Sequence, residues 1–245
     1  MLANASVPLL GLVDTAVIGN LGETTDLGAI ALGALIFTFV YWSFGFLRMG
    51  ATGFTAQANG AGDEAEVRAV LGRFVIMAVI LGLMIIALQL PIRSLAFSLL
   101  EGGVTVESLA MEYFDIRIWG APATLLTFSL MGLLVGLGNS KQLLIVQLFL
   151  NGLNISLDIY FAGILNLGVA GIALGTVIAE WITVCFAFLL IVMELKKRKT
   201  PEEAFWSRSG ILDRQKLLRT VSANAGNDGG AGGAGGSIYI IADTL

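Results

Sequence analysis

The sequence predicts an all-α protein that crosses a membrane several times. Hydrophobic residues make up 56% of the 245 positions, charged residues only 13%, and the mean hydropathy is +0.86. This composition leaves too little polar surface for a soluble globule, and long apolar segments follow one another along the chain. Histidine is absent and Cys185 is the only cysteine, which excludes histidine acid–base chemistry, Cys/His metal sites and disulfide bonds. Because the common hydrolase motifs are also absent, we do not expect an enzyme.

Six apolar segments are long enough to cross a bilayer, which takes about 20 residues. We expect these helices at residues 2–20, 27–57, 69–90, 109–138, 143–165 and 169–193. Pro91 should end the third helix and Pro122 should kink the fourth, because proline lacks an N–H and its ring disturbs the preceding turn. We assign the chain to a six-helix transmembrane unit, a cytoplasmic linker and a glycine-rich tail that is disordered or artefactual, at residues 1–199, 200–224 and 225–245.

The positions of lysine and arginine predict the orientation of this unit. The loops after the second and fourth helices contain Arg68 and Lys141, and the segment after the sixth contains four basic residues at 196–199. The loops on the other side contain only Arg93. The positive-inside rule therefore places both ends of the six-helix unit in the cytoplasm.

The fifth helix carries a stripe of polar side chains within an apolar segment. Gln147, Asn151, Asn154 and Asp158 are spaced by four, three and four residues, so they share one face of a helix. A carboxylate at the centre of a membrane helix costs about 2.5 to 3.5 kcal/mol, so Asp158 should face protein, water or an ion. The stripe could line a transport cavity, or its side chains could form hydrogen bonds that hold neighbouring helices together.

Two other helices carry polar residues that could line the same cavity. In the fourth helix, Tyr113 and Arg117 share a face, and in the sixth helix Thr176, Glu180 and Thr183 form a stripe. Arg117 requires an acidic partner on a neighbouring helix, or its side chain must extend to the membrane surface. Its place near a helix end favours the second option. We count Arg117 and Glu180, with Gln147 and Asn151, as possible cavity residues.

Pairs of glycines four residues apart predict where helices approach each other closely. Gly132 and Gly136 lie in the fourth helix, and Gly171 and Gly175 lie in the sixth. Small residues at this spacing allow two backbones to come together in a membrane.

Several segments together resemble the multidrug and toxic compound extrusion (MATE) family, most of all its DNA-damage-inducible F (DinF) branch. They are LVDTAVIGNLG, LRMGATGFTAQANGAGD, IRIWGAPATL, GLLVGLGNSK, NGLNISLD and GVAGIALGTVIAEW, in this order. The resemblance implies one six-helix N-terminal lobe of a twelve-helix transporter whose C-terminal lobe is missing here. It also implies an antiporter of the bacterial inner membrane that uses H⁺ or Na⁺, with no other cofactor, to export amphipathic or cationic small molecules.

The resemblance also implies an ion site. Members of the family build a cation or proton site from an aspartate in the first helix, an asparagine and an aspartate in the fifth, and a threonine in the sixth. These roles fall on Asp14, Asn154, Asp158 and Thr176, and a tyrosine of the fourth helix corresponds to Tyr113. Glu180 has no general counterpart in the family.

The chemistry of these residues suits such a site independently. Two buried carboxylates that lie close together cannot both be ionised at low cost, so one holds a proton or a cation lies between them. Oxygen ligands of this kind suit a hard cation such as Na⁺.

Two alternatives remain from the sequence. One is a flippase for lipid-linked saccharides from the same superfamily, for which several cavity arginines would be expected, whereas only Arg117 and Arg48 are available. The other is a membrane fragment without transport activity, whose polar stripes only hold helices together. We expect lipid and small molecules as partners, and no nucleic acid.

Overall fold

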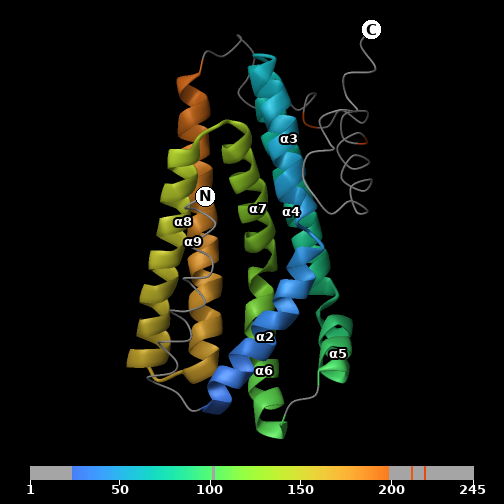
Figure 1. Cartoon of the computed structure of the whole chain (residues 1–245), viewed down its shortest axis with the longest axis vertical. Helices are drawn as coiled ribbons and strands as arrows, with labels where there is room; N and C mark the ends of the chain where they lie inside the picture. The colour runs from blue at the N-terminus through green and yellow to red at the C-terminus, as the bar shows by residue number, and fades with distance from the viewer. Residues whose placement is uncertain (1–23, 101–102, 199–210, 212–217, 219–245) are drawn as a thin grey trace.

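The computed structural model describes residues 24–100, 103–198, 211 and 218, and in these ranges the chain is helical and contains no strand. The elements are α2 (Thr24–Trp42), α3 (Phe46–Gly60), α4 (Glu64–Ala87), α5 (Gln89–Leu99), α6 (Val104–Arg117), η1 (Ile118–Gly120), α7 (Ala121–Gly136), α8 (Ser140–Asp158), η2 (Ile159–Ile164) and α9 (Gly168–Lys197). Figure 1 shows α7, α8 and α9 running side by side along one axis, with α2 crossing obliquely.

Five helical segments of the described part are long and apolar enough to cross a membrane. They begin at Thr25, Glu64, Val104, Ser140 and Gly168 and correspond to the second to sixth expected helices. The all-α membrane fold is therefore confirmed. The first expected helix, at residues 2–20, lies outside the described residues.

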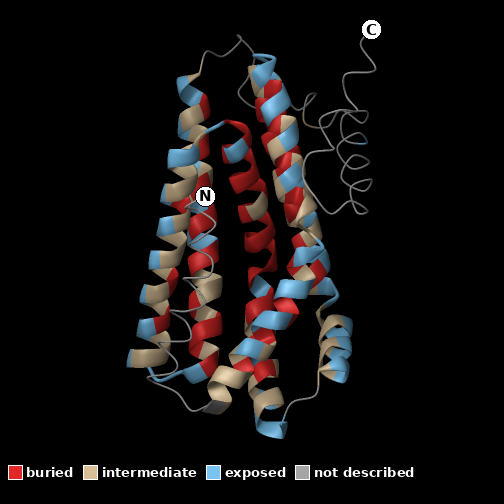
Figure 2. Cartoon of the chain, viewed as in Figure 1, coloured by how far each residue is buried: buried red, intermediate tan, exposed pale blue. Residues whose placement is uncertain are grey.

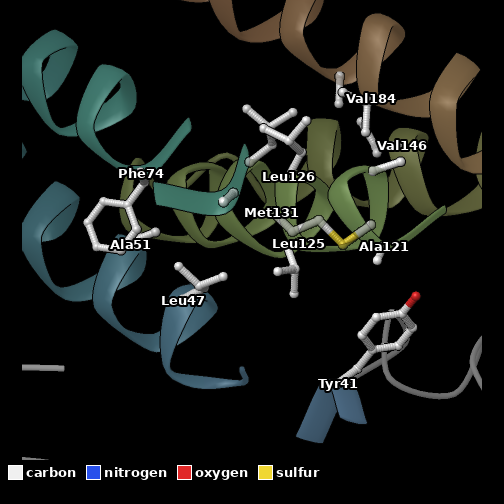
Figure 3. Packing of buried hydrophobic residues seen from close by; sticks show 14 of the residues in the cluster. Tyr41, Leu47, Ala51, Phe74, Ala121, Leu125, Leu126, Met131, Val146 and Val184 are labelled. Carbon is white, nitrogen blue, oxygen red and sulfur yellow. The ribbon is translucent and has the colours of Figure 1, made fainter. Parts of the chain in front are cut away.

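The centre of the bundle is α7, which is buried along almost its whole length (Figure 2). Its side chains pack against α3 and α4 on one side and against α9 on the other. Figure 3 shows Leu125 and Met131 of this helix between Leu47 of α3 and Val184 of α9. The core therefore lies where the fourth expected helix passes through the bundle.

Both glycine pairs allow the close approaches that the sequence predicts. A side chain at Gly132 would collide with the backbone carbonyl of Arg48 in α3, and one at Gly136 would lie 2.7 Å from the carbonyl oxygen of Thr52. Thr52 Oγ1 also donates a hydrogen bond to the carbonyl oxygen of Gly132 over 3.0 Å. In α9, a side chain at Gly171 would lie 2.9 Å from the backbone of η2.

The second expected helix is not continuous, which corrects the sequence prediction. Residues 43–45 form a turn between α2 and α3, in which the N–H groups of Phe44 and Gly45 donate to carbonyls three residues earlier. Gly45 closes this turn, and a side chain there would be 3.3 Å from the carbonyl oxygen of Trp42. The tightened turn replaces the regular pattern of the α-helix.

The boundaries of the third expected helix also differ from the prediction. The helix begins at Glu64, because the Asp63 side chain accepts a hydrogen bond from the N–H of Glu66 over 2.9 Å and caps the first turn. It ends at Ala87, before the proline. Pro91 instead lies in the first turn of α5, where a helix does not use the N–H that proline lacks.

The fourth expected helix is interrupted at the predicted place. The 3₁₀ turn η1 separates α6 from α7, and Pro122 occupies the first turn of α7. Gly82 of α4 packs directly on this proline, because a side chain at Gly82 would overlap with the Pro122 ring. The predicted kink is therefore confirmed as a break in regular helix geometry.

The basic loops predicted to share one side of the membrane lie at the same end of the bundle. Arg198, at the end of α9, donates to Asn59 Oδ1 over 2.6 Å and to Glu64 Oε1 over 3.2 Å. Gln142, at the start of α8, donates to Glu194 of α9 over 2.9 Å. The α3–α4 junction, the start of α8 and the end of α9 thus meet at the upper end of the bundle in Figure 1.

Candidate functional site

The polar stripe of α8 faces protein where it approaches α9. Of all the residues of α8, only Val146, Asn154 and Asp158 are buried, and Asp158 is completely inaccessible. Gln147 and Asn151 are partly exposed. The expectation that Asp158 avoids lipid is therefore confirmed, whereas a cavity role for Gln147 and Asn151 remains a prediction.

A hydrogen bond joins the two helices at the centre of this site. Asn154 Nδ2 donates to Thr176 Oγ1 over 3.2 Å, and the Thr176 hydroxyl donates to the carbonyl oxygen of Ile172 over 2.9 Å. The other amide atom, Asn154 Oδ1, is buried and has no hydrogen-bond donor among the described residues. A buried oxygen acceptor of this kind can serve as a ligand for a hard cation.

Asp158 fits against α9 because residue 175 is glycine. A side chain carbon at Gly175 would overlap with Asp158 Oδ1 and would lie 3.3 Å from the backbone nitrogen of Asp158. Directly after Asp158 the chain changes to the π-helical turn η2. Single π turns occur often at functional sites, and this one was not anticipated from the sequence.

The predicted residues do not all lie in one place. The structure brings together Asn154, Asp158 and Thr176, whereas Tyr113 of α6 packs on Gly33 of α2, with its ring 6.4 Å from the ring of Phe37. Asp14 lies outside the described residues. The described part therefore contains three members of the expected ion site in contact or on adjacent turns.

Arg117 forms a buried ion pair with Glu180 and does not extend to the membrane surface, which corrects the option that the sequence favours. Its Nη1 and Nη2 atoms donate to Oε2 and Oε1 of Glu180 over 2.9 and 2.6 Å. Thr124 Oγ1 donates to the same carboxylate over 2.9 Å. The residues are only 7% and 8% exposed, so the acidic partner on a neighbouring helix is the correct alternative.

Aromatic rings of α2 complete this second cluster, and the sequence analysis did not identify them. The guanidinium carbon of Arg117 lies 5.4 Å from the centre of the Phe37 ring and 5.8 Å from that of Tyr41. These distances are those of cation–π contacts. For Thr124, the remaining polar member of the cluster, the sequence contained a partial signal: its spacing of seven residues from Arg117 would place both on one face of a helix.

The described helices are long and apolar enough to cross a membrane, and they bury a carboxylate, an amide oxygen without a donor and an ion pair. Polar groups buried in this way often mark ion or substrate pathways in membrane proteins. The profile of the protein family described as MatE matches residues 1–160. The chain therefore belongs to the MATE family.

Individual relatives agree with this assignment. The DNA damage-inducible protein F of Escherichia coli strain K12 is 37% identical in an alignment that covers 89% of this chain and 49% of that protein. A probable multidrug resistance protein NorM from Synechococcus is 26% identical over 84% of this chain and 45% of its own. A crystal structure of a MATE protein in the straight conformation superposes with a TM-score of 0.73 and 26% identity, covering 92% of this chain and 50% of that one. The chain thus spans about half the length of the relatives it matches.

Proposed function

We propose that this chain is the N-terminal lobe of an ion-coupled multidrug efflux antiporter of the bacterial inner membrane. In this proposal residues 1–199 form a six-helix lobe whose two ends are cytoplasmic, and residues 200–224 lead toward a second lobe. The coupling ion is H⁺ or Na⁺, and the exported substrate is an amphipathic or cationic small molecule. The observation that carries the proposal is the completely buried Asp158 beside Asn154, whose Oδ1 atom has no donor in the described part of the chain.

The ion site consists of Asp158, Asn154 and Thr176, with Asp14 as the fourth member. A buried carboxylate is costly unless its charge is neutralised, so a proton or a cation at Asp158 stabilises the loaded site. Release of the ion returns a negative charge to the interior. Loading and release therefore change the relative energies of two arrangements of the lobe, which is how an ion gradient can drive export of a second compound.

The side chains of Gln147 and Asn151 supply hydrogen-bonding groups for the substrate in this proposal. They lie on the same face of α8 as the ion site, and both are partly exposed. No observation favours the flippase alternative, because the guanidinium of Arg117 is already paired with Glu180.

The experiment measures ion-dependent stability of the purified chain in detergent. An ion that binds only the folded protein raises its free energy of unfolding by RT ln(1 + [ion]/Kd). If the coupling ion is Na⁺, we expect the unfolding temperature to rise with Na⁺ concentration at constant ionic strength. If it is H⁺, we expect the unfolding temperature to change with pH over the range in which the site takes up its proton. Asp158→Asn and Asp14→Asn should remove this response, because an amide carries no charge and cannot release a proton.

Gln147→Leu is the matched control, since it changes a polar residue of the same stripe outside the ion site. It should retain the ion response and change stability only slightly. The ion-site assignment is wrong if Asp158→Asn responds to ions as the parent does, or if Gln147→Leu alone loses the response.

A further inference from the structure

The buried pair of Arg117 and Glu180 lies where three parts of the bundle meet. Arg117 ends α6 directly before η1, Glu180 projects from α9, and the rings of Phe37 and Tyr41 come from α2. Gly120 in η1 makes room for both charges, because a side chain there would lie 2.8 Å from Glu180 Oε2. The 3₁₀ turn that interrupts the fourth expected helix therefore provides the space that the Arg117 and Glu180 side chains occupy.

The hydrogen bonds of the pair satisfy both oxygens of the Glu180 carboxylate. Both carboxylate oxygens of Glu180 accept from Arg117, and Oε2 accepts a further bond from Thr124. Removing two charges from water carries a large desolvation cost, so a buried pair is weak evidence for a role in stability alone. The place of the pair one helical turn from the proposed ion site favours a role in which its charges act on that site.

The pair is adjacent to the proposed ion site along α9. Glu180 follows Thr176 by four residues, which is one helical turn or about 6 Å along the axis. Thr176 in turn accepts the hydrogen bond from Asn154, one turn from Asp158. The titratable groups that act on Arg117 are Glu180 of α9, Tyr41 of α2 and Tyr113 of α6. Asp158 of α8 is the titratable group of the ion site.

We propose that Arg117 and Glu180 form a charge-balanced positioning pair that sets the cation affinity of the Asp158 site. Together they add no net charge to the neighbourhood of the site, while they fix α9 against the break in the fourth helix. This inference rests on the ion site proposed above and adds a residue pair that does not itself contact the ion.

Single substitutions that break the balance should shift cation affinity in opposite directions. Glu180→Gln leaves the positive charge of Arg117 uncompensated, so Na⁺ or H⁺ should bind more weakly. Arg117→Gln leaves the negative charge of Glu180, so either cation should bind more tightly. For any two unit charges about 10 Å apart in a medium of effective dielectric constant about 20, Coulomb's law corresponds to a change in affinity of about tenfold, and we expect an effect of this order.

The assay is the ion-dependent unfolding temperature of the purified 245-residue chain. For Glu180→Gln, the half-saturating Na⁺ concentration should rise about tenfold, or the midpoint of the pH response should move about one unit lower. Arg117→Gln should give shifts of the opposite sign. The double variant, which restores neutrality with side chains of similar shape, should return the midpoint close to that of the parent.

Trp181→Phe is the matched control, because it removes an uncharged hydrogen bond between the same two segments. Trp181 Nε1 donates to the carbonyl oxygen of Trp119 over 3.3 Å, so it joins the same two segments without a charge. This variant should leave the midpoint unchanged. If Glu180→Gln does not fold because Arg117 is left buried and charged, the comparison of Arg117→Gln with the double variant carries the test. Arg117→Gln should bind the cation more tightly than the double variant, and equal midpoints of the two would overturn the role of the pair.

The outcomes separate this inference from the proposed function. A parent chain whose stability does not respond to Na⁺ or pH would overturn both. A parent that responds, with single variants that shift in the same direction or not at all, would overturn only the role of the Arg117 and Glu180 pair. A double variant displaced as far as either single variant would have the same consequence.

Discussion

The packing of Gly175 against Asp158 gives a prediction whose size can be worked from the structure. In Gly175→Ala the new methyl carbon would overlap with Asp158 Oδ1, 3.3 Å from the backbone nitrogen of Asp158 and 3.4 Å from the carbonyl carbon of Leu157. Rotation of the carboxylate relieves the contact with Oδ1 but not the tight contact with the backbone nitrogen of Asp158, so α8 and α9 must also separate by a few tenths of an ångström. Both changes move the Asp158 carboxylate from its position.

Two effects of opposite sign determine the change in stability. Overpacking of this kind costs about 1 to 3 kcal/mol. Replacement of glycine by alanine within a helix stabilises the folded protein by about 0.5 to 1 kcal/mol. Gly152→Ala is the matched control, because Gly152 lies in α8 with nothing within 4 Å of the added carbon, so it receives only the favourable effect. The two variants should differ by about 1 to 3 kcal/mol in free energy of unfolding.

The assay compares the unfolding temperatures of both variants with and without the coupling ion, followed by tryptophan fluorescence. Gly175→Ala should unfold at a lower temperature than Gly152→Ala and should lose most of the ion response, whereas Gly152→Ala should keep it. If Gly175→Ala matches Gly152→Ala in both temperature and ion response, the close approach of α9 is not what positions the carboxylate.

Two further predictions concern packing and orientation. Gly136→Ala should be less stable than Gly152→Ala by about 1 to 3 kcal/mol, because the added carbon would lie 2.7 Å from the carbonyl oxygen of Thr52 in α3. Thermal unfolding measures this, and equal stability of the two variants would contradict it. Once Cys185 is replaced, a cysteine at Val104 should react in intact cells with a thiol reagent that cannot cross membranes, while one at Arg198 should not. The reverse labelling pattern would invert the proposed topology.

Local patterns in the sequence predicted those features that depend on one helix. The spacing of Asn154 and Asp158 identified the buried face of α8, because a face is determined by periodicity within a single element. The glycine pair of α7 predicted a close approach for a similar reason. Pro122 marked the break in the fourth helix, since the missing N–H is a property of that residue alone.

Features that depend on contacts between distant segments were not predictable in the same way. The pairing of Arg117 with Glu180 joins residues 63 positions apart, and the sequence could state only that an intramembrane arginine requires a partner or a path to the surface. The turn between α2 and α3 contains no proline and carries no strong local signal. The π turn after Asp158 adapts the backbone to its surroundings, so it too depends on packing.

Two irregular turns of this chain each directly follow a buried charged residue, and the membrane environment favours this placement. Backbone groups that leave the regular helical pattern need protein or water around them, because lipid offers no hydrogen bonds. Buried charges have the same requirement. Arg117 lies directly before the 3₁₀ turn η1, and Asp158 lies directly before the π turn η2. Both turns adjoin α9, so the helix that carries Thr176 and Glu180 is in contact with both irregular places. A small displacement of α9 would therefore alter the ion pair and the proposed ion site together, which is the coupling that the opposite charge variants are designed to measure.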